Sequence, residues 1–543
     1  MQKFLVPFSQ IPQLAKTDVA YATGEQALET FYPYKPAPES FPAIVAARAA
    51  FDSPRKTLVG ALKQQYGELP EQAPVGRNID LLLNDHTWTV TTAHQPVLFA
   101  GPLYFLYKAI TTVRLAREAE QALGSPHRVM PVFVLGSEDH DLEELNHARL
   151  FNKTITWQPG HTGPVGVMPS DTLAPVLEEL QLLLGDAGAA LFERVQAAYA
   201  PGQTFAQATR RLLHDLLGSQ GLLVLTMDAP EMKRHFIPVM RDELLNQTAH
   251  RLVSTTIAQL EQAGFKAQAA PREINLFFMK PGLRERIVAE KGGYAVLNTD
   301  LFFSQEAMLA ELEAHPEHFS PNVVLRPLYQ ELMLPNLAYV GGGGELAYWL
   351  ERRSLFAHYG VPYPMLVRRN SVLWLDKESA KRRHRFGLAP EQLFADTDAL
   401  VRAYVESNAG TDLSLQEEAE TVRRVYEKLS KKAQAVDPTL EKAVLADGVK
   451  AVAAVAQWES RLLRAEKQRH ETSVGQIRGL REKLFAGGNG LQERSENALP
   501  FVLKYGDGFV EALMAQLNPF DQGFVVLEET PVAATAVSDV NGG

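Results

Sequence analysis

The chain has 543 residues, too many for one compact core, and its 46% hydrophobic and 22% charged residues are typical of a globular protein with two or more domains. A net charge of −10 argues against a dedicated nucleic-acid binder, and the absence of cysteine excludes disulfides, thiolate metal ligands and a cysteine nucleophile. The sequence has no apolar run long enough to span a membrane and no signal peptide at its start, so we expect a cytoplasmic protein.

The first part of the chain predicts little regular sheet. Residues 1–86 indicate a helical and irregular region with scattered prolines. The pattern then changes, because TWTVTTA (87–93) is rich in β-branched residues and predicts a strand. A helix is expected over 102–122, with Pro102 in its first turn, and RVMPVFVLG (128–136) predicts the next buried strand. Continuous apolar strands joined by a helix are typical of a parallel sheet.

The alternation of strands and helices continues through the middle of the chain. GLLVLTMD (221–228) and VPYPMLVRRNS (361–371) predict strands, and residues 337–360 predict a strand, a glycine loop and a helix. We therefore expect an α/β fold over 87–400, with a Rossmann-like, doubly wound parallel sheet.

One segment interrupts this alternation. We interpret the region around 229–320 as an insertion into the parallel sheet. Within it, EINLFFM (273–279) and RERIVA (284–289) flank the turn sequence PGL, and this pattern predicts an antiparallel pair of strands.

Past residue 400 the pattern becomes helical. Apolar residues at heptad spacing form two seams, broken by Asp437 and Pro438, and they predict an antiparallel coiled-coil hairpin over 401–486. The alternative is a pair of ordinary amphipathic helices packed on the core. Residues 487–530 are expected to return to the core, and 531–543 to form a disordered tail. The two seams consist of Leu415, Ala419, Val422, Tyr426, Leu429, Ala433 and Val436, and of Leu440, Val444, Ala451, Val455, Trp458, Leu462 and Ala465.

Three polar or glycine-rich loops follow predicted strands. Since ligands of doubly wound sheets bind at the carboxyl ends of the strands, the three loops predict one shared site. The loops are AHQPVLFAGP (93–102), with His94, Gln95 and Gly101; GSEDHD (136–141), with Glu138, Asp139, His140 and Asp141; and GGGGE (341–345), with Gly342, Gly343, Gly344 and Glu345.

The glycine loop opens a helix and suits an anion such as a phosphate or a carboxylate. It matches neither the Walker loop nor G-x-G-x-x-G, so a simple tight turn is an equal alternative. His94 can carry a proton or serve as a structural histidine. Arg326, between an apolar run and Pro327, is a candidate to bind a carboxylate or phosphate.

The charged run GSEDHD allows three interpretations. A helix starting at Asp141 would bring His140 and His147 onto one face, where they could bind a metal with nearby carboxylates. The H-x-x-x-H spacing of zinc proteases is missing, so we assign no metal. We favour acid–base catalysis and amine binding by the run, and the remaining alternative is a capped helix start with solvated charges. The segment GGNGLQERSEN (487–497) is expected to be a cap or to close over the site.

Together, five motifs resemble the bacillithiol-biosynthesis family BshC, and they occur in the order of that family over roughly residues 90 to 505. The chain has Ala93-His94-Gln95 where the family has Gly-His-Gln, and a run of glycines before Glu345 where the family often has Gly-Pro-Gly-Glu. The motifs are TTAHQPVLFAGPLYFLYKAI, VFVLGSEDHDLEELNHA, FSPNVVLRPLYQE, GGGGELAYW and GNGLQER.

The resemblance implies a Rossmann-like core related to class I synthetases and a homodimer held by the coiled coil. It implies a cysteine ligase that joins L-cysteine to the amine of glucosaminyl-malate, and such an amide ligation calls for ATP or another nucleotide. A synthetase-like KMSKS loop is not evident, and Arg368-Arg369-Asn370-Ser371 is the best-placed substitute. The competing classes are a metal-dependent hydrolase using Glu138, Asp139, His140 and His147, and a non-catalytic coiled-coil scaffold.

These arguments give two sets of candidate residues. The candidate catalytic residues are His94, Glu138, Asp139 and His140. The candidate substrate-binding residues are Gln95, Gly101, Asp141, Asn322, Arg326, Gly342, Gly343, Gly344, Glu345, Arg369 and Asn370.

Overall fold

The centre of the molecule is a parallel sheet of five strands in the order β13-β12-β2-β3-β6. β3 and β6 lie on one side of β2, and β12 and β13 lie on the other, so the strand order reverses between β2 and β12. This arrangement confirms the predicted Rossmann-like class, whose ligands bind at the carboxyl ends of the strands next to the reversal. The strands are β2 (Thr87–His94), β3 (Arg128–Leu135), β6 (Leu223–Leu225), β12 (Asn336–Gly341) and β13 (Met365–Arg368).

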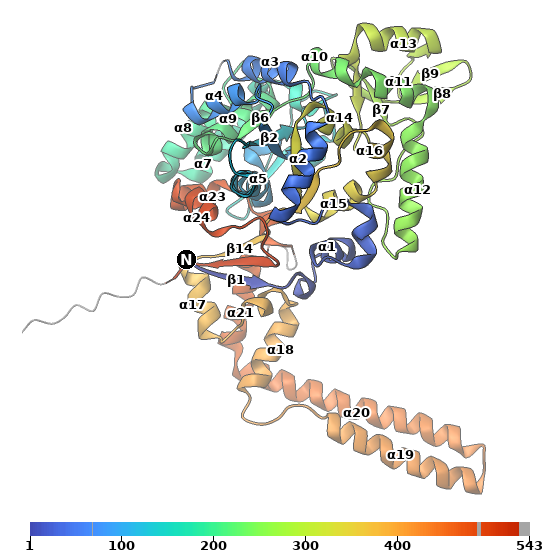
Figure 1. Ribbon diagram of the computed structural model, residues 1–543. Coiled ribbons are helices and arrows are strands. Elements are labelled where there is room, and N and C mark those ends of the chain that lie inside the picture. The colour runs from blue at the N-terminus through green and yellow to red at the C-terminus, as the bar shows by residue number, and fades with distance from the viewer. Residues whose placement is uncertain (68, 486–489, 531–543) are drawn as a thin grey trace, which may run out of the picture.

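The computed structural model describes residues 1–67, 69–485 and 490–530. The predicted tail 531–543 and part of the 487–497 segment lie outside these described residues. Figure 1 shows a rounded body from which a helical hairpin projects. None of the described helices combines the length and the apolar character that a membrane-spanning helix needs.

Both faces of the central sheet are buried, as its apolar strands predicted. Alternate side chains of β3 enter different cores, because Val132 and Val134 pack in one and Phe133 and Leu135 pack in the other. α14 (Arg326–Met333) precedes β12, and the helices that follow β2, β3 and β12 are α5 (Leu103–Leu123), α6 (Leu142–Leu145), α7 (Ala174–Leu184), α8 (Ala189–Ala198), α9 (Phe205–Leu217), α15 (Gly343–Leu350) and α16 (Arg353–Tyr359).

The N-terminal region contains a strand that the sequence did not predict. β1 (Gln2–Val6) pairs antiparallel with β15 (Phe524–Glu528), which in turn pairs parallel with β14 (Val372–Leu375). A short strand at the start of the chain becomes stable here because its partner comes from the far end of the sequence. The rest of the region is helical and irregular, with α1 (Lys16–Ala22), α2 (Phe41–Ala49), α3 (Arg55–Tyr66) and α4 (Ala73–Leu81).

The expected helix beginning at Asp141 is much shorter than predicted. α6 has only four residues, and His147 opens β4 (His147–Leu150), which pairs with β5 (Lys153–Thr156). β-branched residues in β5 favour this hairpin over a longer helix. His140 and His147 therefore do not share a helical face, which was the basis of the metal interpretation.

Between β6 and β12 the chain forms a separate antiparallel sheet in the order β10-β9-β8-β7-β11. β7 and β8 pair around the PGL turn, as expected. The strands are β7 (Leu276–Lys280), β8 (Leu283–Glu290), β9 (Gly293–Val296), β10 (Phe302–Ser304) and β11 (Phe319–Pro321). The helices of this part are α10 (Pro230–Lys233), α11 (Ile237–Asn246), α12 (Thr248–Gln262) and α13 (Gln305–Ala314).

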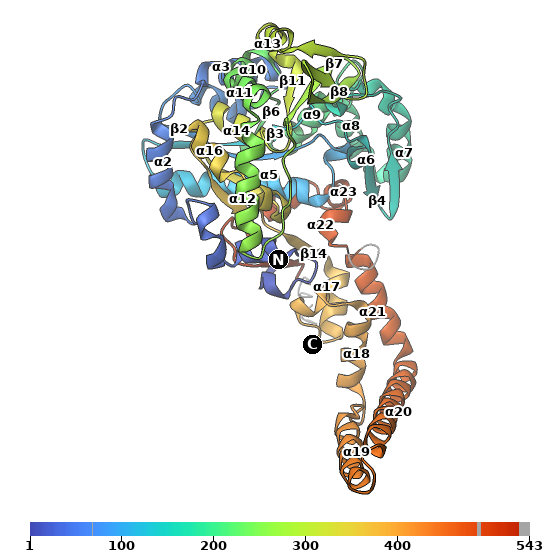
Figure 2. The same cartoon turned by 90° about the vertical axis from the view of Figure 1, so that its right-hand side faces the viewer.

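The C-terminal part confirms the predicted coiled coil. α19 (Gln416–Val436) and α20 (Leu440–Arg469) lie side by side and project from the body in both views (Figures 1 and 2). Gly448 permits their close approach, because an added Cβ would lie 2.8 Å from Cβ of Tyr426. The remaining helices are α17 (Lys377–Arg385), α18 (Thr397–Asn408), α21 (Glu471–Leu484), α22 (Gln492–Ser495), α23 (Leu499–Tyr505) and α24 (Gly508–Gln516).

Candidate active site

A cavity of about 550 Å³ lies at the carboxyl ends of β2, β3, β6 and β12, next to the reversal of strand order. The loops that the sequence singled out meet there, together with α14 and the C-terminal segment. Most of the candidate residues line it, namely His94, Gln95, Glu138, Asp139, Asn322, Arg326, Gly342, Gly343, Gly344, Glu345 and Arg369.

His94 ends β2 and has a hydrogen-bond partner on each ring nitrogen. Nδ1 lies 3.0 Å from the Gln95 carbonyl oxygen, and Nε2 lies 3.1 Å from the Tyr104 hydroxyl. A carbonyl can only accept, so Nδ1 carries the proton and Nε2 accepts from Tyr104. Burial and the nearby Lys108 charge lower the pKa of His94 to about 4. The imidazole is therefore neutral at pH 7, and it orients the Tyr104 hydroxyl.

Lys108 organises the glycine loop from beneath the cavity. Its fully buried ammonium group donates to Glu345 Oε1 at 2.8 Å and to the carbonyl oxygen of Ala93. Glu345 Oε2 accepts from the backbone N–H of Gly342 at 2.8 Å, which caps α15. Burial alone would raise the pKa of Glu345, but the Lys108 charge and hydrogen bond lower it. Both oxygens of Glu345 thus bind protein donors, and Glu345 shapes the loop that lines the cavity.

The start of α15 already faces one carboxylate from the protein. Asp18 packs against Gly343 so closely that an added Cβ would lie 1.9 Å from Cγ of Asp18. The same carboxylate forms an ion pair with Arg368 at 2.7 Å. Gly343 is therefore required for the packing of α1 against α15, in addition to its place in the cavity lining.

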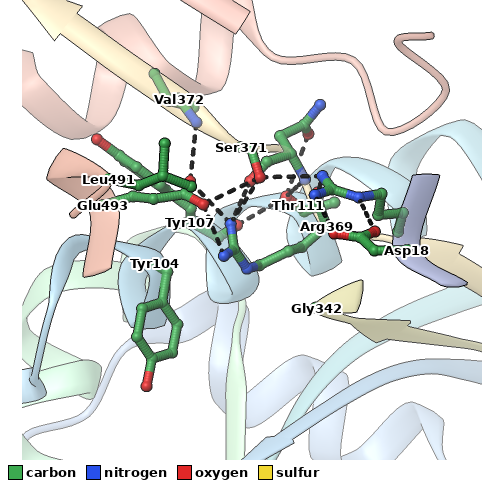
Figure 3. A network of polar contacts seen from close by, with 12 residues as sticks. Asp18, Tyr104, Tyr107, Thr111, Gly342, Arg369, Ser371, Val372, Leu491 and Glu493 are labelled. Atoms are coloured by element: carbon green, nitrogen blue, oxygen red, sulfur yellow. Dashed lines mark hydrogen bonds and ion pairs between the residues drawn. The ribbon is translucent and has the colours of Figure 1, made fainter. Parts of the chain in front are cut away.

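Arg369 connects the cavity to the C-terminal segment (Figure 3). Its guanidinium forms two hydrogen bonds of 2.9 Å with Glu493, which also accepts from the Ser371 hydroxyl and the Val372 backbone N–H. Glu493 is fully buried. The LQER part of the 487–497 segment is thus anchored in the core by Glu493, and the next residue, Arg494, lines the cavity.

Two of the cavity carboxylates are paired with cations from the inserted region. Glu138 forms an ion pair with the buried Lys233. Asp139 accepts from Gln95 Nε2 at 3.0 Å and lies 3.8 Å from Arg284. Burial alone would raise the pKa of Asp139, but Arg284 and the Gln95 hydrogen bond lower it, so this carboxylate is ionised at neutral pH.

Three charged groups of the cavity have no ion-pair partner among the described residues: Asp228, Arg326 and Arg494. Within the part of the chain that the structure describes, Asp228 accepts only from the Ser137 hydroxyl, at 2.9 Å. In the same part, Arg326 donates only to neutral oxygens, those of Gln330 and Tyr348. These are the charges that remain available to a ligand.

Sequence reasoning missed Asp228, Tyr104, Arg284 and Arg494. Asp228 ends the predicted strand 221–228, so its place at a strand end was a usable signal. Arg284 comes from β8 and reaches the site only through tertiary packing.

Four candidate residues lie outside the lining of this cavity. The His140 ring contacts Arg284 and Phe277. The other three have local roles. Asp141 caps α6, and Asn370 is buried against Thr111 and Asn518. Gly101 has a backbone φ of 59°, and its carbonyl oxygen accepts a hydrogen bond from Asn497 Nδ2 at 2.8 Å.

A second cavity of about 570 Å³ adjoins the first and shares its lining at His94, Gln95, Tyr104 and Arg494. The rest of its lining comes from the loop after β2, α6, the β4–β5 hairpin and the residues after Arg494. His147 lies in this second cavity, with Nδ1 3.0 Å from the Glu143 carbonyl oxygen. The neutral His94–Tyr104 pair therefore stands between two adjoining spaces.

The fold and the site define the chain as a Rossmann-like protein with a strand-end cavity and a C-terminal coiled coil. A family model described as "Bacillithiol biosynthesis BshC, N-terminal Rossmann-like domain" matches residues 4–370, and one described as "Bacillithiol biosynthesis BshC, C-terminal coiled-coil domain" matches residues 372–529. The chain belongs to the BshC family.

Relatives in several bacteria share nearly the whole chain. A protein of Flavobacterium johnsoniae is 38% identical over 511 residues, covering 93% of this chain and 96% of the relative. One of Flavobacterium psychrophilum is 34% identical, covering 96% of this chain and 99% of the relative. A protein of Salinibacter ruber is 29% identical, covering 92% and 94%. Each of these relatives is named "Putative cysteine ligase BshC".

Proposed function

We propose that this chain is a ligase that forms a carbon–nitrogen bond between the carboxyl group of L-cysteine and the amine of glucosaminyl-malate. Family membership and the name of the relatives support the cysteine-adding role. The acceptor is proposed from the resemblance to the BshC family. In the metal-dependent hydrolase alternative the ligands would be the charged run and His147, and the loss of the shared helical face removes the basis of that set.

The observation that best supports the proposal is that only some of the charged groups in the first cavity form ion pairs with the protein. Most ionised groups are neutralised by protein partners, whereas Asp228, Arg326 and Arg494 have no ion-pair partner in residues 1–67, 69–485 and 490–530. Asp228 suits an ammonium group, such as that of cysteine. Arg326 and Arg494 suit carboxylates or phosphates, because a guanidinium presents several donors to such oxygens. A cavity with both kinds of charge fits zwitterionic and acidic substrates.

The two adjoining cavities offer room for two substrates. Each has a volume within the range of about 300–1,000 Å³ that holds one small ligand. His94 and Tyr104 line both, so they lie where an amine in one space would meet a carboxyl group in the other. The attacking amine must lose a proton, and the Tyr104 hydroxyl is placed to receive it while its own proton passes to His94 Nε2.

An amide does not form readily from a free carboxylate, so we propose that ATP or another nucleotide activates the cysteine carboxyl group. The residues fit an anionic cofactor, because Arg326, Arg494 and the backbone of Gly344 face the first cavity. Arg369 is less available, since Glu493 neutralises it. The nucleotide supplies activation of the carboxyl group, and the chain supplies binding and orientation.

We also propose a homodimer through the coiled coil. Large apolar side chains are exposed along the hairpin, and an isolated hairpin would leave them in water. They include Val425, Leu429, Val436, Leu440, Leu445, Val449, Trp458 and Leu462. A second copy carries the same stripe, so a symmetric pairing would cover both.

The direct test is a reaction of the purified chain with cysteine, glucosaminyl-malate and ATP or GTP, with the amide product measured by mass spectrometry. Asp228→Asn and Arg326→Gln should each lose activity, and Arg234→Gln, on an exposed arginine outside the cavity, should keep it. Absence of product with every nucleotide would contradict the ligase, and full activity of Asp228→Asn and Arg326→Gln would contradict this site. A scaffold without catalysis predicts the first of these results, no product with any nucleotide.

A further inference from the structure

A cluster of two histidines and two glutamates lies away from both cavities, at the end of α13. One ligand atom from each of His315, Glu317 and His318 falls within 4.8 Å of the others, and no other trio of the described residues does so. The three residues occupy the short turn Pro316–His318 and the residue before it. This turn leads directly into β11 at the edge of the inserted sheet.

The hydrogen bonds of the cluster prepare the imidazole of His318 to bind a cation. His318 Nδ1 lies 2.7 Å from Glu311 Oε1. A carboxylate can only accept, so Nδ1 carries the proton of the neutral ring and the lone pair lies on Nε2. Metal-binding histidines are commonly oriented by a carboxylate in this way. The His315 and His318 rings stack with centroids 4.9 Å apart, so both present nitrogen atoms to the same space.

Glu317 provides an independent sign of a missing partner. Its Oε1 lies 3.1 Å from His315 Nδ1, whereas its buried Oε2 accepts no hydrogen bond from the described residues. A buried, unsatisfied carboxylate oxygen costs free energy, and a bound cation would satisfy it.

We propose that His315, Glu317 and His318 bind one Zn²⁺ ion, with water as the fourth ligand and Glu311 as the carboxylate that orients His318. Two imidazoles and a carboxylate are a ligand set that zinc accepts in tetrahedral geometry. Ligand atoms on one zinc lie about 3.3 Å apart, so the side chains of this surface turn need only small rotations to close around the ion.

The position of the site gives it a structural role rather than a catalytic one. Ser320 and Pro321 of β11, two and three residues beyond His318, line the first cavity. The Phe319 carbonyl oxygen accepts from Lys233, the partner of Glu138. Zinc on this turn fixes the start of β11 and, through it, one side of the substrate cavity.

The test uses the full chain without an affinity tag, stripped with a chelator and titrated with Co²⁺ and then Zn²⁺. We expect one Co²⁺ per chain, with ligand-field absorption typical of tetrahedral coordination, displaced by one Zn²⁺. His315→Gln and His318→Gln should abolish this site, and Glu311→Gln should weaken it about 10- to 100-fold. His250→Gln, an exposed histidine on α12, is the matched control and should bind like the unchanged chain.

Far-UV circular dichroism verifies that each variant is folded, and Zn²⁺-dependent thermal stabilisation gives a second readout. It should be present in the unchanged chain and in His250→Gln and absent from His318→Gln. Failure of the folded, unchanged chain to bind stoichiometric Co²⁺ or Zn²⁺ would overturn the proposal. Equal binding by His318→Gln would also overturn it, because the metal would then lie elsewhere.

Discussion

Replacing Glu493 by glutamine tests how the C-terminal segment is held to the core. The carboxylate accepts four hydrogen bonds: two from Arg369 and one each from the Ser371 hydroxyl and the Val372 backbone N–H. In Glu493→Gln, either orientation of the amide NH₂ faces an N–H donor, and the buried Arg369 charge loses its counter-ion. Glutamine has nearly the same volume, so little of the cost comes from a cavity. Removing one partner of a buried ion pair costs about 3–5 kcal/mol, which is the destabilisation we expect.

The assay is equilibrium urea unfolding of the full chain. The quantity compared is the free energy of unfolding, taken from the transition in which the core unfolds. Glu482→Gln, on an exposed glutamate of α21, is the matched control and should change this free energy by less than about 0.5 kcal/mol. Arg369→Met combined with Glu493→Gln should cost less than the sum of the single variants, because no charge then remains unpaired. A loss below about 1 kcal/mol in Glu493→Gln would refute the reasoning.

Three further predictions follow from the structure. The pKa of His94 is about 4 in the folded chain and near 6.5 when unfolded, so the unfolded chain binds more protons between these values. Stability should therefore fall as pH decreases through this window, by as much as about 3 kcal/mol, and His94→Asn should show a shallower dependence of the urea midpoint on pH; equal dependence would contradict the shift. Gly343→Ala should cost about 1–3 kcal/mol because its Cβ meets Asp18, whereas Gly344→Ala, with its nearest atom at 4.0 Å, should be neutral or stabilising; equal urea midpoints would refute this difference. Trp458→Glu, at a 58% exposed position of the hairpin, should convert a dimer to a monomer in sedimentation velocity, and a monomeric unchanged chain would exclude the proposed dimer.

The sequence predicted the elements whose residues share one local pattern. The apolar runs of β2 and β3 gave the parallel sheet, and the heptad seams gave the coiled coil. Strand-end position brought His94, Glu138 and Gly343 together correctly, because carboxyl ends of parallel strands meet at one edge. The strand β1 was missed because its partner is β15, and the pairing of Gln2 with Glu528 leaves no local trace.

Local sequence patterns also could not show which charged side chains of the site form ion pairs with the protein. Glu138 and Asp139 are adjacent acids, yet their partners Lys233 and Arg284 come from the inserted region. Arg369 looked as available as Arg326, but Glu493 neutralises it from 124 residues away. Tertiary packing decides which charged side chains remain available to a ligand. The sequence could therefore name candidate residues, but it could not show which of them the protein itself neutralises.

The sheet formed by β1, β15 and β14 has a consequence for how the chain acquires its structure during synthesis. Residues 2–6 leave the ribosome more than 500 residues before their partner strand, 524–528. Until β15 has been synthesised, β1 and β14 both lack the strand with which they pair. The segments matched by the two family models, 4–370 and 372–529, are therefore joined in one sheet that only the last described strand completes. A nascent chain interrupted before β15 keeps two exposed strand edges, which invite pairing with other chains.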